Sequence, residues 1–174
     1  MELATINDVD ELVSFYSSVI ENVNKSPVKL GWNINIYPNI DFIKSSIFAG
    51  ELFVIRKDFH IVAAAVVNHK MNDEYDLIDW EVKGPKDKLV TIHALATSPE
   101  YRGGSISDSF LSDIRDYCKA QGDMAIHLDV IDTNYPAYKL YVRNGYKEID
   151  NIKMYYEVVG TREFWMLELV LSLC

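Results

Sequence analysis

Residues 99–107, PEYRGGSIS, combine a proline, an arginine, two glycines and two serines at the start of a helical pattern. Gly103 and Gly104 allow the backbone to turn without a Cβ penalty, so the following helix can present its free N–H groups to whatever lies before it. Arg102 adds a permanent positive charge and a bidentate fork. These residue types predict an anion site, and diphosphate is a common occupant of such a site.

This stretch alone leaves two interpretations open. Neither the spacing G-x-G-x-x-G nor that of a Walker loop is present, so the usual nucleotide fingerprints do not apply. The simpler interpretation is an ordinary strand–turn–helix connection that Ser105 caps and that carries a surface arginine. A second motif is needed to choose between them.

That second motif is NYPAYKLYVRNGY, residues 134–146, which follows the predicted strand IHLDV. With Arg102–Ser107, it resembles the GNAT superfamily, the Gcn5-related N-acetyltransferases. In that superfamily an Arg-Gly-x-Gly-x-Gly/Ala loop opens a helix, and Asn, Ala, a Leu-Tyr pair, Gly and an aromatic residue follow the next strand. The matching positions of the second motif here are Asn134, Ala137, Leu140, Tyr141, Gly145 and Tyr146.

The resemblance covers about residues 50–157 and implies an acetyl-CoA site. The diphosphate would bind the 102–107 amides, and the pantetheine arm would pair with the strand that ends at Thr97. Serine replaces the two later glycines of the family loop, at Ser105 and Ser107, which keeps the backbone donors but crowds the approach of a phosphate. The implied coenzyme-binding residues are Leu95, Ala96, Thr97, Arg102, Gly103, Gly104, Ser105, Ile106, Ser107, Asn134 and Ala137.

The resemblance also implies direct attack by a substrate amine on the thioester, so no nucleophilic side chain is needed. Tyr141 is the candidate general acid for the leaving thiolate. The amine must lose a proton, and His93 is the candidate catalytic base, with Asp129, Asp79 and Glu81 as alternatives. Alternation along the predicted strand puts His93 on the same face as Leu95 and Thr97, where a hydrogen-bonded structural histidine is equally consistent.

Aromatic residues outside the two motifs are candidates for the acceptor site. Trp32 and Tyr37 follow the first predicted helix, and Tyr75 and Trp80 lie in a polar stretch, residues 70–88. We take Trp32, Tyr37 and Trp80 as substrate-binding candidates, although such residues equally often only pack. The sequence does not name the amine, which is a small molecule or a peptide.

The elements that position these residues follow from hydrophobic periodicity. Predicted helices cover residues 6–23, a segment between Pro38 and Gly50, 106–118 and 135–144; predicted strands cover two runs within 51–69, then 88–97, 124–132, 146–159 and 163–173. Thr5 and Asp8 form a predicted capping pair. The predicted fold is a mixed α/β (α+β), mostly antiparallel, twisted sheet with helices on both faces and a splayed central strand pair, in a single domain, residues 1–174.

Composition narrows the function classes. The net charge of −9 disfavours nucleic acid or an anionic membrane as the partner. The two cysteines form no framework, no metal spacing is present, and no signal peptide or membrane span is predicted, so we expect a cytoplasmic protein, with a homodimer left open. The alternatives to an acetyltransferase are a catalytically weak acyl-CoA sensor or interaction module, and a nucleotide-binding α/β domain.

Overall fold

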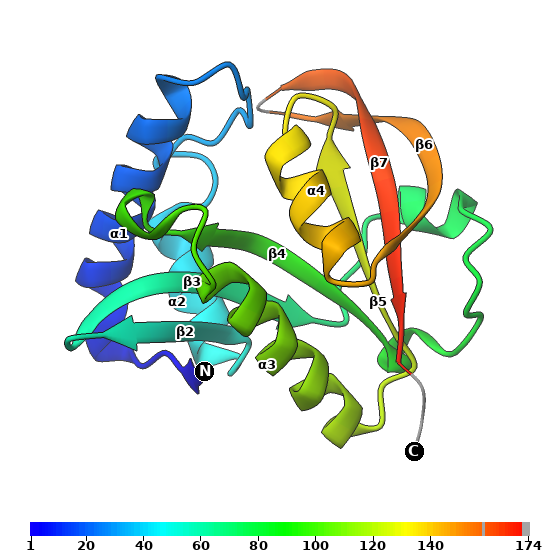
Figure 1. The fold of residues 1–174 in the computed structure, drawn as a ribbon, viewed down its shortest axis with the longest axis horizontal. Coiled ribbons are helices and arrows are strands. Elements are labelled where there is room, and N and C mark those ends of the chain that lie inside the picture. Colours follow the sequence, from blue (N-terminus) through cyan, green and yellow to red (C-terminus); the bar gives the residue numbers. More distant parts are fainter. Residues whose placement is uncertain (158, 172–174) are drawn as a thin grey trace.

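The computed structural model describes residues 1–157 and 159–171, and its centre is one seven-stranded sheet (Figure 1). The strand order is β1-β2-β3-β4-β5-β7-β6, and only β4 and β5 pair in parallel. The strands are β1 (Glu2–Leu3), β2 (Leu52–Lys57), β3 (His60–Asn68), β4 (Leu89–Thr97), β5 (Ala125–Ile131), β6 (Lys147–Tyr156) and β7 (Gly160–Val170). The predicted mixed, mostly antiparallel sheet is confirmed. Residues 172–173 of the last predicted strand lie outside the described residues.

Four α-helices cover the two faces of the sheet, as expected. They are α1 (Val9–Asn24), α2 (Ile40–Phe48), α3 (Ile106–Gln121) and α4 (Tyr135–Arg143). The buried stripes of α1 and α2 pack on one face of β2–β4, whereas α3 and α4 pack on the opposite face (Figure 1). The segment between β3 and β4 covers the rest of the first face, over β5–β7, and carries the short 3-10 helices Asp73–Leu77 and Lys86–Lys88.

A bulge in β4 overturns one expectation about the site. Ala94 has a left-handed φ of 50°, and the register with β3 shifts at this point. The side chains beyond Ala94 therefore change faces: Leu95 packs with α3, whereas His93 bonds Asn68 on the other face. The prediction that His93 shares a face with Leu95 and Thr97 is wrong, because one extra residue reverses the alternation.

The central strand pair separates soon after it forms. β4 and β5 pair only over Leu89–Thr91 and Ala125–His127, and the two strands then diverge (Figure 1). Beyond Thr91, β4 stays paired with β3 along one edge. The backbone groups on its other edge have no partner in β5. The predicted splay is therefore present.

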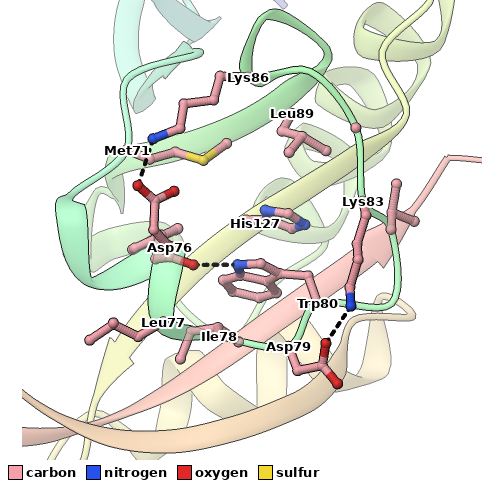
Figure 2. Close-up of a pocket in the computed structure, with 13 residues that line it drawn as sticks. Met71, Asp76, Leu77, Ile78, Asp79, Trp80, Lys83, Lys86, Leu89 and His127 are labelled. Carbon is pink, nitrogen blue, oxygen red and sulfur yellow. Dashed lines mark hydrogen bonds and ion pairs between the residues drawn. The ribbon is translucent and has the colours of Figure 1, made fainter.

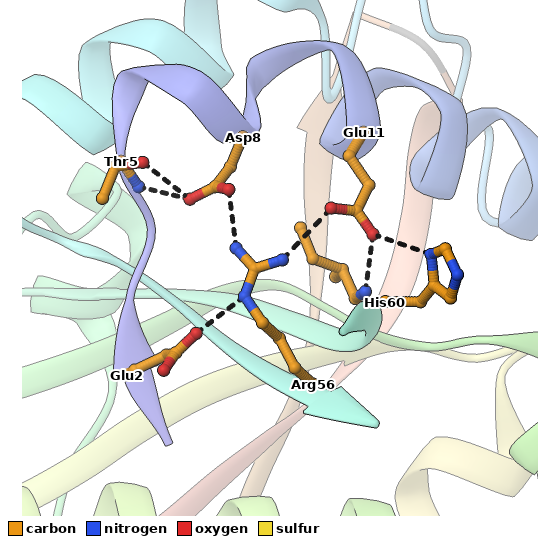
Figure 3. Close-up of polar contacts among 7 residues, drawn as sticks. Glu2, Thr5, Asp8, Glu11, Arg56 and His60 are labelled. Carbon is orange, nitrogen blue, oxygen red and sulfur yellow. Dashed lines mark hydrogen bonds and ion pairs between the residues drawn. The ribbon is translucent and has the colours of Figure 1, made fainter. Parts of the chain in front are cut away.

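Charged residues at the start of the chain fix α1 against β2 and β3 (Figure 3). The Thr5 N–H donates to Asp8 Oδ2 at 2.7 Å, which confirms the predicted capping pair. Arg56 of β2 donates to Glu2, Asp8 and Glu11 at 2.7, 2.6 and 3.1 Å. Burial alone would raise the pKa of Asp8, but hydrogen bonds from Thr5 and Arg56 outweigh it and lower that pKa.

Candidate active site

The turn that carries the first motif is open. Residues 102–105 are exposed, Gly103 has a left-handed φ of 75°, and nothing lies within 4 Å of where a Cβ would stand. Ser105 precedes α3 without a side-chain cap, so the amides of the first helical turn keep their donors. Arg102 donates to Asn22 Oδ1 of α1 and remains exposed. The turn is free to receive an anion.

The turn is joined to both neighbouring elements. Thr97 Oγ1 at the end of β4 lies 2.8 Å from Ser107 Oγ in α3. The Asp108 carboxylate accepts two hydrogen bonds from Arg143 of α4, at 2.8 and 2.9 Å. The unpaired edge of β4, the start of α3 and helix α4 are thus held together at the open end of the splay.

The second motif builds helix α4. Asn134 is its N-cap and accepts a hydrogen bond from the Ala137 N–H at 3.4 Å, and Ala137 packs against the core beside α3. Tyr141 is buried, and its ring meets Tyr146 edge-on at 5.2 Å. Burial, followed by the charge of Asp129, raises the pKa of Tyr141. Within the described residues the Tyr141 hydroxyl has no hydrogen-bond partner, so it is available to a ligand.

His93 is half-buried, and its tautomer follows from its neighbours. The amide of Asn68 is oriented by donation from Nδ2 to Glu51 Oε2 at 2.9 Å, so Asn68 presents its oxygen to His93. His93 Nε2 lies 3.1 Å from that oxygen and 3.0 Å from the carbonyl oxygen of Lys70. Both partners are acceptors, so Nε2 carries the proton and the neutral ring keeps a lone pair on Nδ1. Burial is the main cause of a lowered pKa at His93.

The three alternative bases lie in different surroundings. Asp129, on β5 beyond the paired segment, is half-buried, and its Oδ1 accepts hydrogen bonds from the hydroxyls of Tyr75 and Tyr156 at 2.7 and 3.2 Å. Asp79 is 90% exposed and pairs with Lys83, and Glu81 pairs with Lys147. Only Asp129 lies near His93, since each charge affects the pKa of the other group.

The aromatic candidates form two groups. Trp32 and Tyr37 pack edge-on, with centroids 6.1 Å apart, beside α1 and α2. Trp80 is buried and lines a cavity of about 440 Å³ under the segment between β3 and β4 (Figure 2). The ion pairs Asp76–Lys86 and Asp79–Lys83 lie at the sides of that cavity. The Trp80 ring stacks on the His127 ring, with the two ring centroids 3.9 Å apart. The three substrate-binding candidates therefore lie in two places, Trp32 and Tyr37 in one and Trp80 in the other.

Sequence reasoning missed a buried polar pair below Trp80. His127 Nε2 lies 2.8 Å from Glu168 Oε1, and both side chains are 0% exposed. The carboxylate of Glu168 also accepts the N–H groups of Glu81 and Val82, at 3.0 and 3.1 Å. The only sequence signal was a charged residue inside the apolar run of β7, and nothing in the sequence identified its partner.

The described residues contain no cluster of three or more His, Cys, Asp or Glu side chains able to hold a metal ion. Their helices are all too short or too polar to cross a bilayer.

Comparison with known structures places this arrangement in a known class of fold. An acetyltransferase of the GNAT family from Streptococcus agalactiae superposes with a TM-score of 0.82 at 19% identity, over 98% of this chain and 94% of that chain. The ribosomal-protein-S18-alanine N-acetyltransferase from Escherichia coli gives 0.69 at 16% identity, over 99% and 94%. A putative acetyltransferase from Salmonella typhimurium, in a structure with its cofactor acetyl-CoA, gives 0.70 at 14%, over 98% and 92%.

The family follows from the sequence itself. The model of the acetyltransferase (GNAT) family matches residues 20–146, which include both motifs and the separated strand pair. The chain therefore belongs to the GNAT family of acetyltransferases. Among curated proteins, none matches the sequence significantly.

Proposed function

We propose that the protein is an acetyl-CoA-dependent N-acetyltransferase whose acceptor is a primary amine, either a small molecule or a peptide. The open turn at α3 carries this proposal. It follows the unpaired edge of β4, and Asp108 just after it bonds Arg143 of α4, the helix that also carries the unbonded hydroxyl of Tyr141. The Salmonella structure with acetyl-CoA and the Escherichia coli enzyme that acts on a protein alanine support this class of reaction.

The residues present fit the coenzyme. The amides of residues 103–107 and the guanidinium of Arg102 would hold the diphosphate, and Ser105 and Ser107 retain the backbone donors that the family glycines supply. Leu95, Ala96 and Thr97 would pair with the extended pantetheine arm through the edge that β5 leaves free. Ser107 is already fixed to Thr97, so its hydroxyl helps to shape the site rather than fill it.

His93 would take the ammonium proton, and Tyr141 would hold the leaving sulfur. Once Nδ1 of His93 has the ammonium proton, the amine nitrogen would attack the thioester carbonyl carbon. As the carbon–sulfur bond breaks, the second proton of that nitrogen would pass to the departing sulfur, so the products are the amide, the free thiol and protonated His93. The raised pKa of Tyr141 keeps its phenol protonated and makes complete transfer of the phenol proton costly, so its main contribution is a hydrogen bond to the departing sulfur.

A thiol-release assay with acetyl-CoA and a panel of primary amines tests the proposal. We expect Tyr141→Phe to lower turnover by about 10²–10³-fold, as for the loss of one hydrogen-bond donor to a developing anion. Tyr135→Phe is the matched control, because Tyr135 lies on the same helix and is 51% exposed. A loss below threefold in a folded Tyr141→Phe variant would remove this residue from the mechanism.

The second candidate is a sensor that binds acyl-CoA without turning it over, which the serines at 105 and 107 favour. Coenzyme binding without thiol release across polyamines, aminoglycosides, amino acids and peptides would support it. Competition by ATP or NAD instead of coenzyme A would point to the nucleotide-binding alternative. Four further points stay predictions from the sequence: a single domain, a cytoplasmic location, a possible homodimer and no nucleic-acid partner.

A further inference from the structure

Asp129 has one oxygen occupied and one free. Its Oδ1 accepts the hydroxyls of Tyr75 and Tyr156. Within residues 1–157 and 159–171, Oδ2 has no hydrogen-bond partner, and no lysine or arginine pairs with the carboxylate. The residue lies on the part of β5 that has already separated from β4. A half-buried carboxylate with a free oxygen at this place requires an explanation.

Two phenols from distant parts of the chain hold this carboxylate. Tyr75 comes from the segment between β3 and β4, and Tyr156 from the end of β6. After burial, the negative charge of Asp129 also contributes to the raised pKa of Tyr37 and of Tyr141. The carboxylate is therefore fixed where β6 and the β3–β4 segment meet β5.

The electrostatics favour a cation at the free oxygen. Burial raises the pKa of Asp129, whereas the hydrogen bonds from Tyr75 and Tyr156 and the charge of His93 oppose that shift. A positive partner close to a carboxylate favours its charged form and offsets the effect of burial. An ammonium group at Oδ2 would be such a partner.

The same surroundings disfavour a second negative charge. Within the described residues no lysine or arginine pairs with Asp129, and Lys70, whose carbonyl bonds His93, is itself paired with Glu51 at 2.8 Å. An amine with a carboxylate on the same carbon would bring that carboxylate close to Asp129 without a counter-ion. Such a ligand would bind less well than its amide.

We propose that Asp129, held by Tyr75 and Tyr156, binds the ammonium group of the acceptor, and that the acceptor has no carboxylate on its amine-bearing carbon. Simple alkylamines and the N-terminal amines of peptides share this chemistry, whereas free α-amino acids do not. The assignment rests on the proposed function, since it names the acceptor class of the same site.

Matched probe pairs test it: phenylalaninamide with phenylalanine, alaninamide with alanine, and phenethylamine as an alkylamine. We expect kcat/KM in the thiol-release assay to be at least tenfold higher for each amide than for its acid. Asp129→Asn should raise KM for the amides by about 10- to 100-fold, as for a lost charge-assisted hydrogen bond, with coenzyme affinity unchanged. Asp116→Asn, at a carboxylate on α3 that is 66% exposed, is the matched control and should change nothing.

A second variant and an NMR measurement test the ammonium site even if Asp129→Asn does not fold or no acetyl group is transferred. Tyr156→Phe retains the carboxylate and should raise KM about fivefold, so it replaces Asp129→Asn if that variant does not fold. The ¹³C resonance of the Asp129 carboxyl should move when phenylalaninamide is added and not when phenylalanine is added, whether or not any acetyl group is transferred. Movement without thiol release would support the ammonium site while the proposed enzyme fails.

The proposal is overturned if phenylalanine serves as well as phenylalaninamide, if Asp129→Asn or its replacement variant leaves KM unchanged, or if no probe moves the carboxyl resonance. The last outcome would leave the coenzyme site and Tyr141 unaffected, since neither is measured by it.

Discussion

Two carboxylate–histidine pairs lie on the same face of the sheet, and they differ in exposure. Glu168 and His127 are sealed: the carboxylate accepts three donors, the ring lies under Trp80, and neither side chain is exposed. Among the described residues His127 Nδ1 also has no hydrogen-bond partner, but it is buried. Asp129 and His93 are half-buried, so their unbonded atoms, Oδ2 and Nδ1, belong to partly exposed side chains. The first pair holds strands and a loop together, and the second is the one we propose for proton transfer and acceptor binding.

The sealed pair should give the largest effect on stability. Glu168→Ala leaves His127 and two backbone N–H groups unpaired in the interior, so we expect the free energy of unfolding to fall by about 3–5 kcal/mol. Urea denaturation measures it, and Glu163→Ala, at an exposed position of the same strand, is the control. A fall of under 1 kcal/mol would mean that the Glu168–His127 pair contributes little to the stability of the fold.

The open pair should give the next largest effect, on activity rather than on folding. We expect His93→Asn to lower kcat/KM by about 10²-fold while the free energy of unfolding falls by about 1 kcal/mol, because the half-buried ring is held by hydrogen bonds from Nε2 alone. His60→Asn, at a histidine whose side chain is 83% exposed, is the control. Equal kcat/KM in His93→Asn and wild type would exclude His93 as the base.

The pH dependence of activity gives a second test of His93 as the base. The base must be neutral, and burial lowers the pKa of His93 from its ordinary 6.5. Activity should therefore persist below pH 6.5 and decline only as the pH falls through the lower folded value. Nitrogen NMR of the ring should show the proton on Nε2; a proton on Nδ1 of the neutral ring would contradict the assigned tautomer.

The smallest effect is expected at the partly exposed charges around Arg56, where the side chains of Arg56 and Asp8 are 25% and 14% exposed. Arg56→Met should cost only about 1 kcal/mol, because partly exposed ion pairs are screened by water. The lowered pKa of Asp8 means that its contribution is complete above its ordinary value of 3.8 and is lost as the pH falls through the folded value. Denaturation series at pH 6 and pH 3 measure both. An Arg56→Met effect as large as that of Glu168→Ala would mean that exposure does not separate these clusters.

Local patterns were sufficient for much of this fold. The apolar stripe of residues 9–23 predicted helix α1, and the glycine turn and the Asn134 motif identified the family; the coenzyme end that they indicate is a prediction. The bulge at Ala94 carries no local signal, since an alanine was not expected at a left-handed position. The Glu168–His127 bond and the orientation of Asn68 toward His93 also join residues far apart in the chain. Periodicity reports which face a residue occupies, not which atom it meets there.

The left-handed residue in β4 has a consequence for mutation. Ala94 and Ala96 both pack toward α1, and Tyr16 of that helix donates to the Ala94 carbonyl at 2.9 Å. The two alanines therefore tolerate different substitutions. Position 94 must adopt a left-handed φ, which excludes β-branched residues, whereas position 96 must only stay small. The backbone conformation limits the first position, and side-chain volume limits the second.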